Sequence, residues 1–305
     1  MNELVVETRE LTKKYGDRFA VDKVSMTVRR GDVYGFLGPN GAGKTTTLRM
    51  MLGLIRPTAG SASILGEPAG TSSVTARVGA LVEGPGFFPY LTGRDNLRAM
   101  ARYRGLPNSV VDDALVRVDL ADRGDDTFKS YSLGMKQRLG VASALMGDPE
   151  LIVLDEPTNG LDPAGMSDMR ALVVDLAHAG QTVLLSSHLL AEVQEICDRV
   201  GVINEGRLLR ESTVAELRGS TTLRVRGLPV DRALAVAMRI AGDDGVRVEG
   251  DRLMIDLPAD RAPEVTRALV ADGVDVHEVT AGERTLEEVF FEMTGPLDKR
   301  MEKVS

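Results

Sequence analysis

An eight-residue loop pattern constrains this chain more than any other feature of its sequence. The loop has separated glycines followed by a lysine and a hydroxyl residue, the pattern of a phosphate-binding loop. An apolar run at residues 33–37 precedes it and predicts a buried strand, and helical spacing follows from residue 44. In order, the eight residues are Gly38, Pro39, Asn40, Gly41, Ala42, Gly43, Lys44 and Thr45.

The residue types in this loop predict their roles. Glycines let backbone N–H groups converge on phosphate oxygens, and the start of a helix adds partial positive charge. Lys44 can reach the outer phosphates of a nucleotide, and the Thr45 hydroxyl can bind magnesium. A chance glycine-rich turn is the alternative, but every position of the pattern and the elements around it fit. We therefore expect a nucleotide site.

Two adjacent carboxylates, Asp155 and Glu156, follow a second apolar run at residues 151–154. Alone, such a pair could be a solvated strand end. With a phosphate loop earlier in the chain, Asp155 can hold magnesium through water and Glu156 can polarise the attacking water. His188 follows another short strand, residues 182–186, and in a parallel sheet this puts it at the carboxyl edge, where it could contact the γ-phosphate.

The order of elements predicts an α/β fold for the first two thirds of the chain. Residues 4–28 read as antiparallel strands and turns. Residues 93–147 lose the strand signal and show helical spacing, which predicts a helical insertion. Beyond it, short apolar strands alternate with helical stretches at 164–178 and 189–197, which favours a parallel sheet.

A change of pattern near residue 219 predicts a domain boundary, with domains at 1–218 and 219–305. The second domain has no glycine-rich phosphate loop. Its expected elements follow the order βαββαβ, which suggests a small α+β domain of ferredoxin-like topology. A final helix is expected at residues 286–293. Regulation, support of a dimer and stabilisation all remain open as roles for this domain.

Composition limits the compartment and the partners. The chain has 305 residues, of which 43% are hydrophobic and 27% charged, as in an ordinary globular protein. Its formal net charge of −8 argues against broad electrostatic binding to nucleic acid or to an anionic membrane. Cys197 is the one cysteine, so a reducing compartment is expected. No run approaches the about 18 apolar residues that span a bilayer.

These motifs make the first two thirds of the chain resemble the nucleotide-binding subunits of ABC transporters. The resemblance implies ATP and Mg²⁺ as ligands, a role for Tyr15 as the ring stacked on adenine, and His188 as a catalytic switch residue beside Glu156. It implies a P-loop nucleotide-binding domain with an antiparallel β subdomain and a helical signature subdomain. The residues it assigns to the nucleotide are Tyr15, Gly38, Pro39, Asn40, Gly41, Ala42, Gly43, Lys44, Thr45, Thr46, Ser132, Gly134 and Asp162, the last in the D-loop.

The signature segment is expected at residues 131–138, in a divergent form. Ser132 and Gly134 keep the family's places, whereas Leu133 and Met135 replace the usual glycine and glutamine. The hydroxyl, the amide and the helix start can cap a γ-phosphate, although the segment taken alone favours a simple helix N-cap. In the family the signature of one subunit completes the phosphate loop of another. A second ATP-binding subunit is therefore implied, most simply an identical one.

A further departure from the family is Glu83, which stands where a glutamine is common. The substitution puts a carboxylate near the metal, so Glu83 joins Thr45 and Asp155 as an expected magnesium ligand. Phe87 and Phe88 follow it and suit a surface that meets a membrane subunit, with core packing as the alternative.

The resemblance implies the ATP-hydrolysing subunit of a transporter, working peripherally at the cytoplasmic face of the membrane through a separate transmembrane subunit. The divergent segments look like the subgroup that exports bacitracin-like peptides, lantibiotics or drugs. The main alternative is a soluble ABC-type ATPase that remodels ribosome or DNA complexes. Such proteins commonly carry two ATPase units, long coiled coils or zinc-binding cysteines, whereas this chain has one set of motifs and one cysteine. We therefore expect no nucleic-acid partner. A binding module without turnover is disfavoured because Glu156 and His188 are both present.

Overall fold

The structure is a computed structural model that describes residues 3–218, 222–282 and 290. The chain divides into two compact units, Met1–Thr213 and Val214–Ser305. This division falls one short helix, α8 (Val214–Arg218), before the boundary expected from the sequence. The assignment of 1–218 and 219–305 as separate domains stays a prediction.

The first unit begins with an antiparallel sheet built around its longest strand, β1 (Leu4–Tyr15). Apolar side chains of β1 and β2, such as Val6 and Val21, are fully buried and hold the sheet against the rest of the unit. The predicted antiparallel entry is confirmed. The strands bonded to β1 are β2 (Arg18–Val24), β3 (Thr27–Arg29) and β5 (Ala59–Ile64), and β5 also pairs with β6 (Glu67–Pro68).

The central sheet carries the site and has the order β11-β10-β4-β9-β8-β7. Its strands are β4 (Val33–Leu37), β7 (Val78–Leu81), β8 (Leu151–Asp155), β9 (Thr182–Ser187), β10 (Arg199–Asn204) and β11 (Arg207–Thr213). All pairs are parallel except β10–β11. Strands β4, β8 and β9 are buried along their whole length, as expected for a parallel sheet covered on both faces.

The register of these strands explains why distant motifs meet. Leu37 pairs with Ser187, and Asp155 pairs with Ser186. The carboxyl ends of β4, β8 and β9 therefore share one edge of the sheet. The phosphate loop follows the first of these ends, and the carboxylates and the histidine follow the other two.

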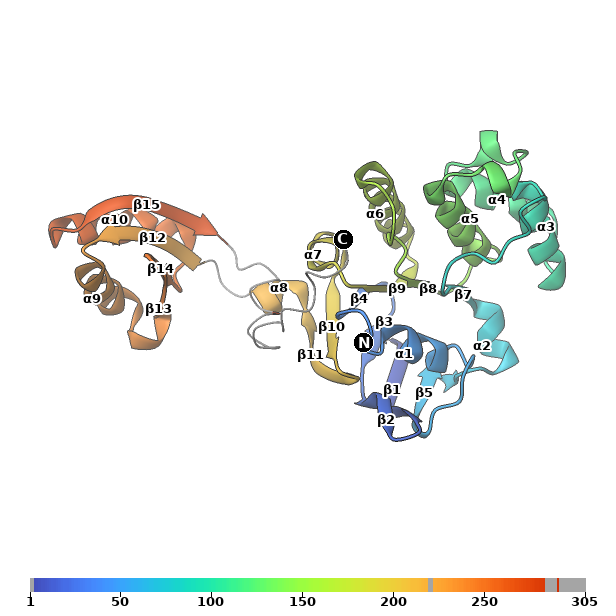
Figure 1. Ribbon diagram of the computed structural model, residues 1–305, viewed down its shortest axis with the longest axis horizontal. Coiled ribbons are helices and arrows are strands. Elements are labelled where there is room, and N and C mark those ends of the chain that lie inside the picture. The colour runs from blue at the N-terminus through green and yellow to red at the C-terminus, as the bar shows by residue number, and fades with distance from the viewer. Residues whose placement is uncertain (1–2, 219–221, 283–289, 291–305) are drawn as a thin grey trace. The chain divides into compact units, whose positions relative to one another are not determined.

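The predicted helical insertion is confirmed and is coloured from teal to mid-green in Figure 1. Its helices are α3 (Gly93–Tyr103), α4 (Ser109–Arg117) and α5 (Leu133–Leu145), with short 3-10 turns η1 (Ala121–Arg123) and η2 (Phe128–Ser130). The other helices of this unit are α1 (Lys44–Met51), α2 (Ser72–Arg77), α6 (Pro163–His178) and α7 (Leu190–Ile196).

The second unit has the predicted ferredoxin-like topology. Its antiparallel sheet has the order β13-β14-β12-β15, so the first and third strands lie adjacent at the centre. The elements are β12 (Thr222–Leu228), α9 (Val230–Ala241), η3 (Asp243–Gly245), β13 (Val246–Glu249), β14 (Arg252–Ile255), η4 (Ala259–Arg261), α10 (Ala262–Ala271) and β15 (Asp275–Gly282). The helix expected at 286–293 lies outside the described residues, apart from Phe290.

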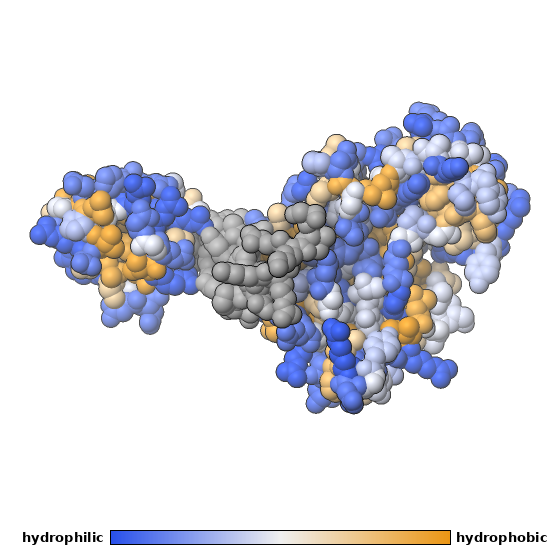
Figure 2. Space-filling model, viewed as in Figure 1, coloured by the Kyte–Doolittle hydropathy of each residue, from blue (hydrophilic) through white to orange (hydrophobic). Residues whose placement is uncertain are grey.

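Hydrophilic side chains cover most of the visible face of both units, interrupted by smaller apolar areas (Figure 2). Within the described part of the chain, none of the helices has the length and apolar character that crossing a membrane would require.

Candidate functional site

The phosphate loop joins β4 to α1, as predicted, and two of its glycines are required by its conformation. Gly41 and Gly43 have φ angles of 81° and 108°, which favour glycine. A β-carbon on Gly43 would lie 2.5 Å from the carbonyl oxygen of Ala20, and one on Gly38 would lie 2.2 Å from that of Ile203. The loop is thus packed against β2 and β10 too closely for side chains at these positions.

Lys44 lies beneath the loop with only 5% of its side chain exposed. Its Nζ donates to the carbonyl oxygens of Gly38 at 2.6 Å and Pro39 at 3.2 Å. The same atom lies 3.0 Å from Oε1 of Glu156. The cation is therefore positioned in the loop and beside the second carboxylate.

Asp155 is held from both sides by hydroxyl groups. Thr45 Oγ1 donates to its Oδ2 at 2.8 Å, and Ser186 Oγ donates to its Oδ1 at 2.5 Å. Among the described residues no group of three or more His, Cys, Asp or Glu could cage a metal. Magnesium often keeps its waters and binds one or two carboxylates together with phosphate oxygens. The oxygen ligands of Thr45 and Asp155 fit that ion.

Glu156 turns out of the strand with a left-handed φ of 49°. Its backbone N–H donates to Ser186, at 3.2 Å to the carbonyl oxygen and 3.0 Å to Oγ. His188 Nδ1 lies 2.6 Å from Glu156 Oε2. Glu156 therefore lies between Lys44 and His188, so the structure brings these predicted residues together.

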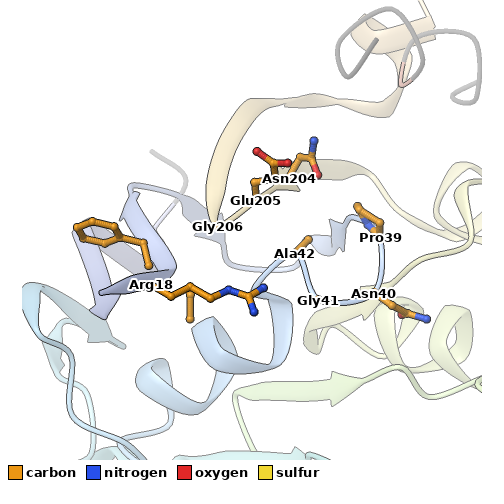
Figure 3. Close-up of a pocket in the computed structure, with 10 residues that line it drawn as sticks. Arg18, Pro39, Asn40, Gly41, Ala42, Asn204, Glu205 and Gly206 are labelled. Carbon is orange, nitrogen blue, oxygen red and sulfur yellow. The ribbon is translucent and has the colours of Figure 1, made fainter. Parts of the chain in front are cut away.

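Two pockets flank the loop, and Arg18 lines both. It extends its guanidinium from the start of β2 toward the loop (Figure 3). This group has no hydrogen-bond or ion-pair partner within the described part of the chain. The inner pocket, of about 220 Å³, is lined by Arg18, Ala20, Asn40, Gly41, Gly43, Lys44, Thr45, Thr46 and Glu156. The outer pocket, of about 290 Å³, is lined by Arg18, Phe19, Ala20, Pro39, Asn40, Gly41, Ala42, Asn204, Glu205 and Gly206.

Tyr15 and Glu83 are predicted site residues that line neither pocket. Tyr15 ends β1, is 54% exposed, and has Lys13 Nζ 5.1 Å from the centre of its ring. Glu83 is exposed and forms an ion pair with Arg49 in the last turn of α1. The adenine contact of Tyr15 and the metal contact of Glu83 stay predictions.

The signature and D-loop residues cap helices. Ser132 is the N-cap of α5, and its hydroxyl accepts from Met135 N–H at 3.2 Å. Asp162 is the N-cap of α6 and accepts from Gly165 N–H at 3.0 Å. A β-carbon on Gly134 would meet only Ser132 Oγ, at 3.9 Å, so the described part of this chain does not itself require glycine there.

The two adjacent phenylalanines have different environments. Phe87 is half-buried and packs edge-on against Phe128, with ring centres 5.3 Å apart, so core packing describes it. Phe88 is 53% exposed and lies 6.0 Å from Tyr90. The loop from Phe88 to Asn96 is held by the Asn96 side chain, which is only 1% exposed. Its amide oxygen accepts from Phe88 N–H at 2.8 Å, and its amide nitrogen donates to the Phe88 carbonyl oxygen at 3.0 Å.

Sequence reasoning missed three contributors to this site: Arg18, Ser186 and the β10–β11 turn at residues 204–206. The turn carried a signal, because Val200, Val202 and Ile203 form an apolar strand pattern that ends at a Glu-Gly pair. Arg18 and Ser186 carried no sequence signal, because only the pairing of the strands brings them next to the site residues.

Comparison with known proteins identifies the family. The family described as ABC transporter matches residues 21–159. The bacitracin transport ATP-binding protein BcrA of Bacillus licheniformis is 39% identical over 298 residues, which are 95% of this chain and 97% of that protein. The chain belongs to the family of ABC transporter ATP-binding proteins. The daunorubicin resistance ATP-binding protein DrrA3 of Streptomyces coeruleorubidus is 37% identical and covers 96% of each chain.

The solved structures agree with this family. That of cbiO1 from Clostridium perfringens, part of the ABC transporter complex cbiONQ, has a TM-score of 0.64 and 27% identity, covering 70% of this chain and 90% of that one. The predictions of fold class, ATP binding and ATP hydrolysis coupled to transport are confirmed by the family. As an ATP-binding subunit of a transporter, this ABC protein works with a membrane partner at the cytoplasmic face.

Proposed function

We propose that this ABC subunit powers the export of a peptide antibiotic or a drug through a separate transmembrane subunit. The observation that carries this proposal is the similarity to BcrA and DrrA3 over almost the whole chain, including the second unit. These relatives are named for bacitracin transport and daunorubicin resistance, which favours export over the remodelling of ribosome or DNA complexes.

The site supports ATP binding through its charges and its backbone. Amide groups of the loop would surround the phosphates at the start of α1. Lys44 would reach the outer phosphates. The guanidinium of Arg18, which has no ion-pair partner among the described residues, would add a second cation at the rim. Thr45 and Asp155 would hold Mg²⁺, which neutralises charge on the β- and γ-phosphates when bound.

Hydrolysis would depend on Glu156 as the group that polarises the attacking water. In the structure its Oε1 faces Lys44 and its Oε2 faces His188. A phosphate that attracts Lys44 would free Oε1 to accept a proton from water, while His188 keeps the carboxylate oriented. Ser186 fixes the neighbouring backbone and Asp155 at the same time.

Ser132 and Gly134 would complete the site of a second copy of this chain. The open space beside Gly134 supports a close approach by a phosphate group from outside. Light scattering of the Glu156→Gln chain with ATP and magnesium tests this pairing, because slow hydrolysis should let the ATP-bound dimer accumulate. A species of twice the chain mass is expected, and a monomer that has bound ATP would contradict it. Phe88 and Tyr90 would form part of the surface for the membrane subunit, because both are exposed on a loop held by Asn96.

Export can be tested by producing the chain together with a candidate transmembrane subunit from a neighbouring gene in a bacitracin- and daunorubicin-sensitive host. We expect the pair to raise resistance to one of these compounds. A Lys44→Ala variant should abolish the effect because it removes the cation from the phosphate loop. Stimulation of ATP hydrolysis by ribosomes or DNA, with no change in resistance, would contradict the proposal and favour the remodelling alternative.

A further inference from the structure

A buried carboxylate lies below the loop that carries His188. Glu192, in α7, is only 2% exposed. Its Oε2 accepts a hydrogen bond from Ser187 Oγ at 2.7 Å. Its Oε1 is also shielded from solvent and has no hydrogen-bond partner among the described residues. Burying a carboxylate is unfavourable, so a position that keeps one calls for an explanation beyond packing.

Ser187 connects this carboxylate to both sides of His188. While its hydroxyl donates to Glu192, the same oxygen accepts from Leu189 N–H at 3.0 Å. The carbonyl oxygen of Ser187 accepts from Gly38 N–H at 3.2 Å, at the start of the phosphate loop. The residues before and after His188 are therefore fixed by one hydroxyl group.

The orientation of that hydroxyl requires an acceptor at Glu192. A serine hydroxyl has a single proton. The Ser187 oxygen uses a lone pair to accept from Leu189 N–H, so its proton has to point away toward another acceptor. In the structure that acceptor is Glu192 Oε2. A carboxylate is a stronger acceptor than a neutral oxygen.

Close packing of α7 against β4 keeps Glu192 in this position. A β-carbon on Gly35 would lie 2.7 Å from Val193 Cγ1 and 2.9 Å from Cys197 Sγ, so the helix and strand are in direct contact. Val193 is fully buried and Cys197 is buried as well. The helix cannot shift to expose Glu192 without breaking this contact.

We propose that Glu192 is a positioning residue for His188. It orients the Ser187 hydroxyl, which fixes the backbone on both sides of His188 and so sets the 2.6 Å contact between His188 and Glu156. The inference rests on the proposed role of Glu156 and His188 in hydrolysis, but the geometry it describes can be measured without nucleotide.

The first test is the NMR spectrum of the histidine rings in the full chain labelled with ¹³C-histidine. The sequence has three histidines, His178, His188 and His277, so each signal can be assigned by a single substitution. Glu192→Ala and Ser187→Ala should both shift the His188 signal and leave the other two in place. Glu195→Ala is the matched control, because Glu195 lies on the same helix, is exposed, and pairs with Arg170.

The second readout separates positioning from binding. Glu192→Ala should lower kcat for ATP by about 10- to 100-fold with little change in KM, because small misplacements near reacting groups have effects of this size. Glu192→Gln keeps an acceptor for Ser187 and should restore most of kcat. The double variant Ser187→Ala with Glu192→Ala should be no slower than either single variant, since the two residues act through one hydrogen bond.

An unchanged His188 signal in the folded Ser187→Ala and Glu192→Ala chains would overturn the proposal. Ser187→Ala removes one hydroxyl group and decides the question if Glu192→Ala does not fold. Additive losses of kcat in the double variant would also contradict it. If the His188 signal moves as expected but Glu156→Gln hydrolyses ATP normally, the positioning role stands and the proposed role of Glu156 fails.

Discussion

Single charged side chains determine what the phosphate loop can do. Lys44 is paired with Glu156, and Asp155 is held by Thr45 and Ser186. One ion pair and two hydroxyl hydrogen bonds therefore fix these three charged side chains. Side chains held in this way lose little conformational entropy on binding a nucleotide.

Glu83 is the residue whose predicted role most needs a direct test, because the structure pairs it with Arg49. If Glu83 binds magnesium, Glu83→Gln should raise the magnesium concentration needed for activity and leave nucleotide binding without metal unchanged. Arg49→Ala is the matched variant, since it removes the ion pair and keeps the carboxylate. Equal effects of Glu83→Gln on metal activation and metal-free binding, or no effect, would exclude the metal role.

Cys197 offers a test of the packing behind the site. Burial, reinforced by the negative charges of Glu192 and Asp198, raises the pKa of its thiol well above the usual value. Because the thiolate is the nucleophile, the folded chain at pH 8 should react with iodoacetamide far more slowly than the unfolded chain. Alkylation rates in buffer and in concentrated urea measure this difference. Equal rates would show that α7 does not cover the thiol.

At the scale of elements, contiguous motifs were predicted well and several of the flanking strands were not. The phosphate loop and β8 were recognisable because all their residues are contiguous: a glycine pattern in one case, an apolar run with two carboxylates in the other. The strands β5, β7, β10 and β11 were not predicted. Strands β5 and β11 are largely exposed and carry weak periodicity, whereas β10 has an apolar run that the sequence analysis left unassigned.

Residues that act through tertiary contacts were also invisible in the sequence. Arg18 reaches the loop from another strand, and Ser186 meets Asp155 through the β8–β9 register. Glu192 has the residue type of an exposed helix position and is buried nonetheless. No local pattern distinguishes these three residues from ordinary surface residues.

The loop between Phe88 and Asn96 should depend on one buried amide. Asn96→Ala removes hydrogen bonds to Phe88 and Thr92 and leaves the partly buried Phe88 N–H without its acceptor. The free energy of unfolding should fall by about 1–3 kcal/mol. Asn108→Ala is the control, since this exposed residue caps α4 without a side-chain hydrogen bond, and its effect should be within about 0.5 kcal/mol. Equal losses in urea denaturation would contradict the role of Asn96.

At the scale of the whole molecule, ATP binding should belong to the first unit alone. Every residue that lines the two pockets lies before Thr213. A chain that ends at Arg218 should therefore fold and bind ATP with the affinity of the full chain. Calorimetric titration of both chains measures this. Loss of binding by a folded, shortened chain would show that the two predicted domains are not independent.

The central claim is that this ABC subunit hydrolyses ATP with Glu156 as the base. The most direct test is the rate of ATP hydrolysis at saturating ATP and magnesium, for the full chain and for Glu156→Gln. Removing the base should slow hydrolysis by about 10²- to 10⁴-fold while ATP still binds. Glu205→Gln, at a carboxylate that lines only the outer pocket, should keep the normal rate. A Glu156→Gln chain that hydrolyses ATP at the rate of the unaltered protein would contradict this account.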